Sequence, residues 1–230
     1  DRLGLSATVA TVTGDDLTDR LDEVEIRAFS NDAPIRTGGI LTANAYLGCT
    51  GIAAALDRGA DIVVCGRVTD AALAMGPAVH AFGWKPDDWD RLASALVAGH
   101  ILECGAQATG GNFSFFQEVP GLERVGFPLV EMRRDGTFVV TKHPGTGGMV
   151  TTETVTAQIL YEIGGHRYAN PDVTARFDTI RLRQAGPDRV EVNGVVGEPP
   201  PPELKVAVTR LGGYRNQVTF VLTGLDVEAK

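Results

Sequence analysis

The sequence predicts an α/β fold in which a partial parallel α/β layer precedes an antiparallel β-rich segment. Two observations carry this prediction. The run "ADIVVCG" at 60–66 is short, apolar and rich in β-branched residues, which is typical of a parallel strand covered on both faces. From residue 177 onward the chain alternates between short strand-like runs and turn residues. We therefore divide the chain into an α/β ligand-binding part, 1–165, and an antiparallel β-rich part, 166–230.

The first part alternates strand and helix patterns. The residues at 5–13, "LSATVATVT", predict a strand, and those at 14–25 predict a helix with Asp15 or Asp16 as its N-cap. Small and apolar residues then recur at helical spacing, which predicts a buried helix over 43–59 that ends at Gly59. The same spacing predicts two further helices after the buried strand, at 69–82 and 87–104.

The first part ends with a predicted hairpin at 127–142, turned by Arg-Asp-Gly, and a predicted helix at 151–164. Proline residues at 199–202 indicate a stiff connection. "LGGYR" at 211–215 is typical of a hairpin turn. Four strands are predicted around these turns, at 177–184, 189–196, 204–211 and 214–224.

Only two strands are predicted before residue 70, which is too few for a doubly wound sheet. We therefore expect the chain to be a piece of a longer protein that lacks its N-terminal strands.

Composition narrows the classes of partner. The formal charge of −8 and the pI of about 5.0 argue against nucleic acid and acidic membranes, which select a basic face. No apolar run is long enough to span a membrane, and no signal peptide pattern is present. Three widely spaced cysteines predict reduced, buried thiols in a cytoplasmic protein. We expect a small-molecule substrate, and either a homo-oligomer or a partner subunit.

The triplet Thr-Gly-Gly occurs at 37–39, 109–111 and 146–148. The copies follow no fixed period and have dissimilar surroundings, which excludes a repeat architecture.

The first candidate site is "VVCGRVTDAAL" at 63–73, where a buried strand meets a helix. Ligands bind at the carboxyl ends of such strands. Arg67 could hold a carboxylate or phosphate, and Asp70 could accept a proton or orient a hydroxyl. The alternative is that Asp70 only caps the helix and pairs with Arg67.

The second candidate is the end of the 87–104 helix, where His100, Glu103 and Cys104 follow an apolar stripe. The helix C-terminus and Glu103 would raise the pKa of His100, which suits acid/base catalysis. Metal ligation by these three side chains is a weaker alternative, and no metal is expected. A hydrogen-bonded core histidine paired with Glu103 is a further alternative. Gly110 and Gly111 follow this helix as candidate substrate-binding residues.

The third candidate, "KHPGTGGMVTT" at 142–152, has the composition of an anion-binding turn before a helix capped by Thr151 or Thr152. It lacks the ending of a Walker A motif, and a plain surface turn is the alternative. The candidate ligand-binding residues here are Lys142, Gly145, Thr146, Gly147 and Gly148. Asn44 joins them from the start of the predicted 43–59 helix, although a connecting loop also explains its region.

Several blocks together resemble the acyclic terpene utilisation (AtuA) family. They are "LTANAYLG", "GADIVVCGRVTDAAL", "AGHILECGAQATGGNF", "FVVTKHPGTGGMVT" and "QILYEIG". The blocks include Arg67, Asp70, His100 and the glycines of the second and third triplets. The segment 33–41 departs from the family pattern, which separates the first triplet from any shared site. The resemblance implies a role in catabolism of citronellol- and geraniol-type terpenoids through CoA thioesters, with a lyase step on a branched substrate.

We therefore expect an enzyme that acts on a CoA thioester or similar anionic acyl substrate by lyase, hydratase or isomerase chemistry. The turn at 145–148 would hold a phosphate or thioester-side oxygen, and Arg67 a carboxylate. His100, Glu103 and Asp70 would supply acid/base chemistry, without a cofactor. These groups are expected to converge on one pocket. The alternative is a non-catalytic subunit or ligand-binding module of a multi-component complex.

Overall fold

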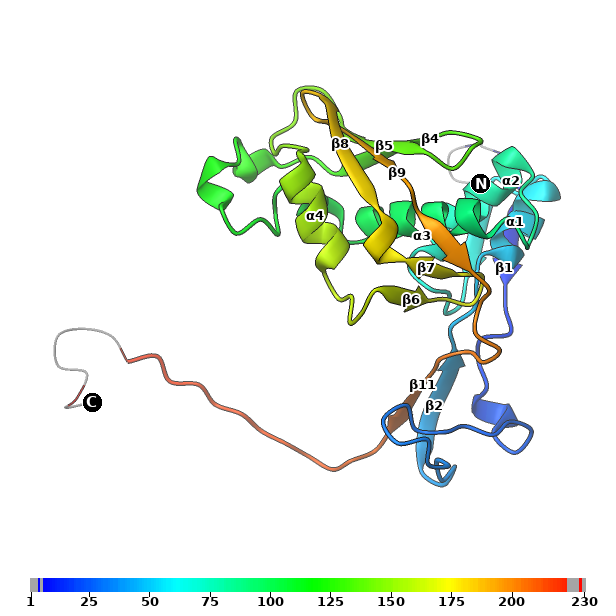
Figure 1. Ribbon diagram of the computed structural model, residues 1–230. Helices are drawn as coiled ribbons and strands as arrows, with labels where there is room; N and C mark the ends of the chain where they lie inside the picture. The colour runs from blue at the N-terminus through cyan, green and yellow to red at the C-terminus, as the bar shows by residue number, and fades with distance from the viewer. Residues whose placement is uncertain (1–3, 5, 223–227, 229–230) are drawn as a thin grey trace.

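The computed structural model describes residues 4, 6–222 and 228 and has the mixed α/β architecture that the sequence predicts (Figure 1). The helices are α1 (Thr50–Asp57), α2 (Ala72–Phe82), α3 (Trp89–Glu103) and α4 (Thr152–Leu160). The strands are β1 (Val9–Val12), β2 (Ile40–Ala45), β3 (Ile62–Cys65), β4 (Pro128–Met132), β5 (Phe138–Lys142), β6 (Arg167–Ala169), β7 (Thr174–Arg176), β8 (Arg181–Gly186), β9 (Arg189–Asn193), β10 (Val196–Glu198) and β11 (Val206–Arg210).

The parallel layer consists of β1 and β3, which pair from Val9 opposite Ile62 to Val12 opposite Cys65. Helix α1 packs on one face of this pair. The other face is open: Val9 is 60% exposed, Ile62 50% and Val64 51%. The prediction that the 60–66 strand is covered on both faces is therefore wrong within the described residues.

Two predicted helices are shortened. The helix predicted over 43–59 is confirmed only from Thr50 onward, as α1, because residues 43–45 belong to β2, which pairs antiparallel with β11 from the far end of the chain. The segment 14–25 keeps only a 3-10 turn at Thr18–Arg20. Its backbone bonds to β2 instead, through Leu17 N to Ala43 O (2.8 Å) and Ala45 N to Asp15 O (2.7 Å).

Helix α3 is the centre of the core. It is buried without interruption from Leu92 to Ile101, and it contacts α2, α4, β4, β7 and β10. Gly99 permits a close approach to the start of α2, since a Cβ at this position would lie 2.7 Å from the backbone of Ala71. Both predicted helices of this region, 69–82 and 87–104, are confirmed, with slightly later starts.

A four-stranded antiparallel sheet, in the order β4-β5-β9-β8, lies over this core. Its inner face presents Phe138, Val140, Val190 and Val192, each fully buried. The predicted hairpin and the 189–196 strand are thereby confirmed, although the second of these ends at Asn193. After Gly194, whose φ is +74°, the chain moves into a separate small sheet, β10-β7-β6. The three-residue strands β6 and β7 are too short to show an alternating pattern, and the sequence did not predict them.

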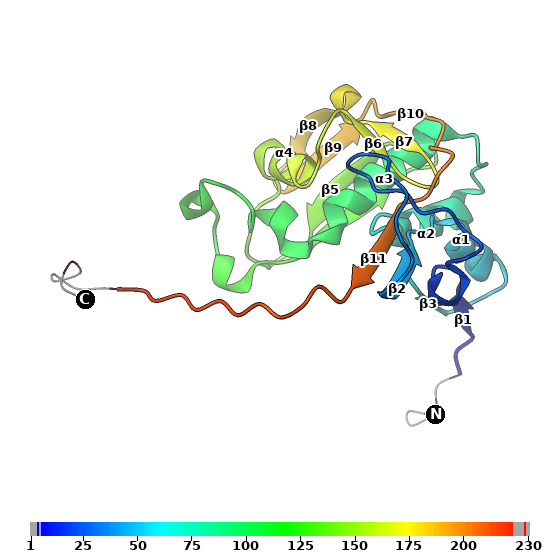
Figure 2. The same ribbon diagram turned by 90° about the horizontal axis from the view of Figure 1, so that it is seen from below.

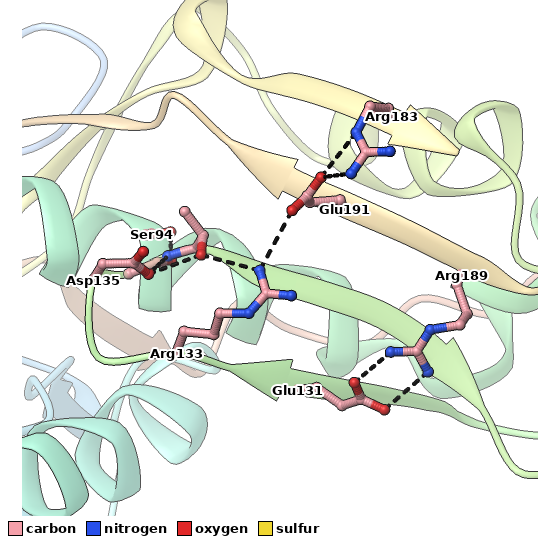
Figure 3. Close-up of polar contacts among 9 residues, drawn as sticks. Ser94, Glu131, Arg133, Asp135, Arg183, Arg189 and Glu191 are labelled. Atoms are coloured by element: carbon pink, nitrogen blue, oxygen red, sulfur yellow. Dashed lines mark hydrogen bonds and ion pairs between the residues drawn. The ribbon is translucent and has the colours of Figure 1, made fainter. Parts of the chain in front are cut away.

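The outer face of the four-stranded sheet is held by ion pairs (Figure 3). Arg189 forms an ion pair with Glu131 across the sheet, and Glu191 forms ion pairs with both Arg183 and Arg133. Val139 lies between Glu131 and Glu191 in the strand register and is only 3% exposed. The polar side chains thus cover the apolar middle strand that they flank.

The ribbon of β2 and β11 projects from the body, and the chain continues beyond it as an extended segment (Figures 1 and 2). The described residues 211–222 form no strand, so the predicted strand at 214–224 is not seen there; residues 223 and 224 lie outside the described residues. The proline stretch connects β10 to β11, as predicted.

Candidate functional site

A cavity of about 580 Å³ lies where the parallel strands β1 and β3 end. This is the edge at which α/β proteins bind ligands. Its walls combine charged, amide, aromatic and aliphatic side chains from four segments of the chain. They are Asp15, Asn44, Tyr46, Val63, Cys65, Gly66, Arg67, Val68, Asp70, Leu73 and Ala207.

Arg67 follows β3 and is about half exposed, with 46% of its side chain accessible. Its guanidinium carbon lies 5.0 Å from the centroid of the Tyr46 ring. The Nζ atom of Lys205 lies 4.6 Å from the same centroid. Tyr46 therefore contacts two cations, of which Arg67 lines the cavity, and the planar guanidinium can still form a two-pronged bond with a carboxylate.

Asp70 lies beside Arg67, with 3.7 Å between Oδ1 and Nη1. The ion pair between Asp70 and Arg67, which the alternative interpretation expects, is thus present, but Asp70 does not cap the helix. Helix α2 begins at Ala72, and no side chain caps it. The Asp70 side chain is 58% exposed and lines the cavity, so it remains accessible to a ligand.

Asp15 organises the cavity, although the sequence suggested it only as a helix cap. Its Oδ2 accepts hydrogen bonds from the backbone N of Arg67 (2.7 Å) and from Nδ2 of Asn44 (3.1 Å). The hydrogen bond from the Arg67 amide lowers the pKa of Asp15, which keeps it ionised. Gly66 is required here, because a Cβ would lie 2.0 Å from the carboxylate.

A signal for Asp15 was present in the sequence. Glycine followed by a charged residue comes shortly after both parallel strands, as "TVTGD" after β1 and "VVCGR" after β3. Strands that run in parallel end at the same edge, so these two charged residues had to meet.

His100 lies elsewhere, in the core between α3 and α4, and is 6% exposed. Its Nε2 donates to the carbonyl oxygen of Gln158 (3.0 Å), and its ring packs against Tyr168 and Phe177. Burial lowers the pKa of His100, and this outweighs the raising effect of Glu103, so the expected upward shift is wrong. The geometry is that of a neutral, hydrogen-bonded core histidine whose partner is a carbonyl rather than Glu103.

Glu103 and Cys104 form a contact of their own at the end of α3, where Sγ donates to Oε2 at 2.5 Å. Burial, followed by the bond to Glu103, raises the pKa of the Cys104 thiol to about 11. His100, Glu103 and Cys104 do not form a metal-binding group, and no such group of three or more His, Cys, Asp or Glu side chains occurs in the described part of the chain. All three cysteines are free, but only Cys49 is fully buried as predicted.

The turn at 145–148 uses its amides internally. Gly147 N donates to Arg124 O (2.9 Å) and Gly148 N to Pro120 O (2.7 Å). Lys142 is 7% exposed, donates to Thr146 O (2.7 Å) and pairs with Asp188 (3.3 Å). A separate cavity of about 330 Å³ lies here, but the Lys142 ammonium and the amides of Gly147 and Gly148, which were expected to bind an anion, are already bonded to the protein.

The start of α4 is satisfied in the same way. Thr151 caps the helix, as predicted, and forms a reciprocal capping box with Thr154. Gln184 Oε1 accepts from Thr152 N (3.2 Å), and Glu153 lies in the first turn. The positive end of the α4 helix dipole, which faces the turn, is therefore already compensated by these groups.

The second and third Thr-Gly-Gly triplets pack against each other. Met149 N donates to Thr109 O (2.9 Å), and the Thr109 hydroxyl donates to Gly126 O (2.5 Å). A Cβ on Gly148 would lie 2.6 Å from Thr109 O, and one on Gly147 would lie 1.8 Å from Gly121 O. Gly110, with φ of +117°, and Gly111 likewise abut Val119 and Ala106. These glycines allow close backbone packing.

The predicted residues thus separate into three groups. Arg67, Asp70 and Asn44 share the cavity at the strand ends. Lys142, Gly145, Thr146, Gly147 and Gly148 line the smaller cavity. Neither cavity is lined by His100, Glu103, Gly110 or Gly111. The expected convergence of Arg67, His100 and the 145–148 turn on one pocket does not occur in these cavities.

Comparison with known proteins identifies the family. The family described as "Acyclic terpene utilisation family protein AtuA" matches residues 1–230. The chain belongs to the AtuA family. Searches of curated proteins and of solved structures each found no match. Membership in the AtuA family connects the chain with acyclic terpene utilisation. Among the residues that the structure describes, no helix is long and apolar enough to cross a membrane.

Proposed function

We propose that the chain carries the ligand site of an enzyme of acyclic terpenoid or branched acyl catabolism. Its substrate would be a CoA thioester or a similar anionic acyl compound. The observation that carries the proposal is the pair Arg67 and Asp70, which lines one cavity at the ends of β1 and β3. A fixed cation beside an accessible carboxylate suits binding and proton transfer on one small anionic ligand.

Arg67 would bind the anionic group of the substrate. Its charge is opposed by Asp70 at 3.7 Å, but both side chains are about half exposed, so this pair is weak and can be exchanged for a ligand carboxylate. Contact with Tyr46 orients the guanidinium, and the hydrogen bond from Arg67 N to Asp15 fixes the backbone beneath it.

Asp70 would act as the acid/base group. Lyase, hydratase and isomerase reactions of acyl thioesters share a proton transfer at a carbon or hydroxyl near the acyl carbonyl. His100 does not line this cavity and is hydrogen-bonded to Gln158 O, so we assign the role to Asp70. Asn44 Nδ2 is held by Asp15, which leaves its amide oxygen to accept from a substrate hydroxyl.

A thermal-shift comparison with free CoA, acyl-CoAs and free carboxylic acids tests the proposal. We expect the protein to be stabilised by acyl-CoAs or carboxylic acids, because a ligand that binds only the folded state raises the melting temperature. Arg67→Ala should abolish the shift. No shift with any ligand would contradict the proposal.

Arg91→Ala is a matched control for Arg67→Ala. Arg91 pairs with Asp88 three residues away (3.2 Å), as Arg67 pairs with Asp70, and its side chain is similarly exposed at 43%. It does not line the cavity. We expect Arg91→Ala to keep the full ligand shift. An equal loss in both variants would show that Arg67 acts only through general surface charge.

A second candidate function is a non-catalytic ligand-binding subunit. It is favoured by the open apolar face of the β1–β3 pair, where Val9, Ile62 and Val64 are each at least half exposed. Parallel strands are normally covered on both faces. This candidate would be favoured if the wild-type protein binds acyl-CoA but does not turn it over, and if the Asp70→Asn variant behaves in the same way.

A further inference from the structure

We propose that residues 214–220 fold back along β11 as a third strand of the β2–β11 ribbon and place Val218 and Phe220 along the wall of the cavity. The strand would supply an apolar surface that selects a long acyl chain. The strand pairing stands on geometry alone, whereas the choice of ligand rests on the proposed function.

The free edge of β11 provides the place for this strand. Strand β2 is already flanked on both sides, by β11 and by the segment at 15–17. Strand β11 has β2 on one side, and no described strand pairs with its other side. An unpaired strand edge presents a row of backbone donors and acceptors that favours the addition of another strand.

The turn that would deliver the strand follows directly. Gly212 and Gly213 follow β11 after Leu211. Gly213 already has φ of +105°, whereas the φ of Gly212 is not positive and would have to change for the chain to fold back. Two-residue hairpin loops need such positive φ values, which glycine adopts without strain. The residues beyond the turn are already extended and exposed: Tyr214 is 100% exposed and Phe220 82%.

The register follows from a two-residue loop. Leu211 would face Tyr214, and counting outward places Val218 opposite Ala207 and Phe220 opposite Lys205. Directly opposite residues share one face of a sheet. Ala207 lines the cavity and is itself opposite Asn44 on β2. Val218 would therefore extend the same wall by one strand, about 4.8 Å.

The side chains suit this position. Alternation places Val218 and Phe220 on the cavity face and Gln217 and Thr219 on the other face. In the extended state Val218 is 72% exposed, so both apolar side chains gain burial when the strand pairs. Apolar side chains beside Arg67 would give a bipartite site, cationic at one end and suited to an alkyl chain at the other.

Engineered cysteines test the strand. In a background where Cys65 and Cys104 are replaced by serine, Val208→Cys with Gln217→Cys should form a disulfide within one molecule on mild oxidation, because these positions would lie directly opposite. Val208→Cys with Val218→Cys is the matched control and should not, because its side chains would lie on opposite faces. A disulfide between two molecules, or none, would overturn the strand.

The selectivity of binding for acyl chains of different length tests whether Phe220 lines the cavity. By calorimetry, Phe220→Ala should weaken binding of decanoyl-CoA roughly tenfold and leave acetyl-CoA binding unchanged. Phe116→Ala, which removes another exposed ring outside the cavity, should change neither. If Phe220→Ala weakened the binding of both thioesters equally, or of neither, the placement of Phe220 along the cavity wall would be contradicted. If the wild type binds neither thioester, the proposed function fails while the disulfide result still decides the strand.

Discussion

The body of the molecule and its site region differ in how completely they are buried. In the body, the four-stranded sheet covers α3, and Phe138, Val140 and Val192 are fully buried. In the site region, the β1–β3 pair leaves Ile62 and Val64 about half exposed, and the ribbon beyond it projects from the body. The body is thus complete within the described chain. The site region offers the open surface that a ligand or another segment can cover.

The largest effect on stability is expected from a substitution in the core of the body. Phe138→Ala should lower the free energy of unfolding by about 3–5 kcal/mol, because it leaves a cavity in the inner face of the sheet. Ile62→Ala, on the open face of β3, should cost less than about 0.5 kcal/mol. Urea unfolding measures both. Similar losses would mean that the open face is covered in solution.

The next effect concerns the paired glycine triplets. Gly147→Ala should destabilise the protein by about 1–3 kcal/mol, since its Cβ would overlap Gly121 O. Gly164→Ala, at a position with open space and ordinary φ, is the control and should be nearly neutral. A stable Gly147→Ala variant that had lost ligand binding would restore the anion-binding interpretation.

A smaller effect follows from the buried imidazole. Burial lowers the pKa of His100 below its ordinary 6.5, so the unfolded chain binds more protons once the pH falls below about 6.5. Stability should therefore be lost as the pH falls through this window. The urea midpoint should drop less between about pH 7.5 and about pH 5.5 in His100→Gln than in the wild type or in the exposed control His143→Gln. An equal drop in all three would show that His100 does not contribute.

The smallest effect is expected on the outer face of the sheet. The ion pair with Arg189 lowers the pKa of the Glu131 carboxyl group, and Arg189→Ala removes this pair. Both side chains are about half exposed. The urea midpoint should fall only slightly, and the difference should vanish at about 0.5 M salt because exposed pairs are screened. A difference that persists in high salt would instead indicate lost cover over Val139.

The long regular elements of the body could be predicted from the sequence. The helices α2, α3 and α4 and the β4–β5 hairpin follow local periodicity and turn chemistry. Elements set by distant partners could not. Asn44 lies in a strand because β11 pairs with it, and the amide of Cys49 before α1 is bonded by Asp172, 123 residues away.

The candidate site could be predicted from the sequence only in part. Arg67 and Asp70 were found because a strand-to-helix junction is a local pattern. His100 and the glycine turn were expected to join them, but helical spacing shows only that a side chain faces inward, and a glycine-rich composition does not show whether the amides are free. In the structure, His100 donates its hydrogen bond to Gln158 O, and the amides of Gly147 and Gly148 donate theirs to backbone carbonyls.

The proposed ligand site lies at the ends of β1 and β3 and not at the glycine turn. Amide chemical-shift mapping with decanoyl-CoA tests this directly. We predict that the signals of Asn44, Gly66, Arg67 and Asp70 shift, while those of Gly145, Gly147 and Gly148 stay in place. Shifts centred on the turn, with none at the strand ends, would contradict the claim.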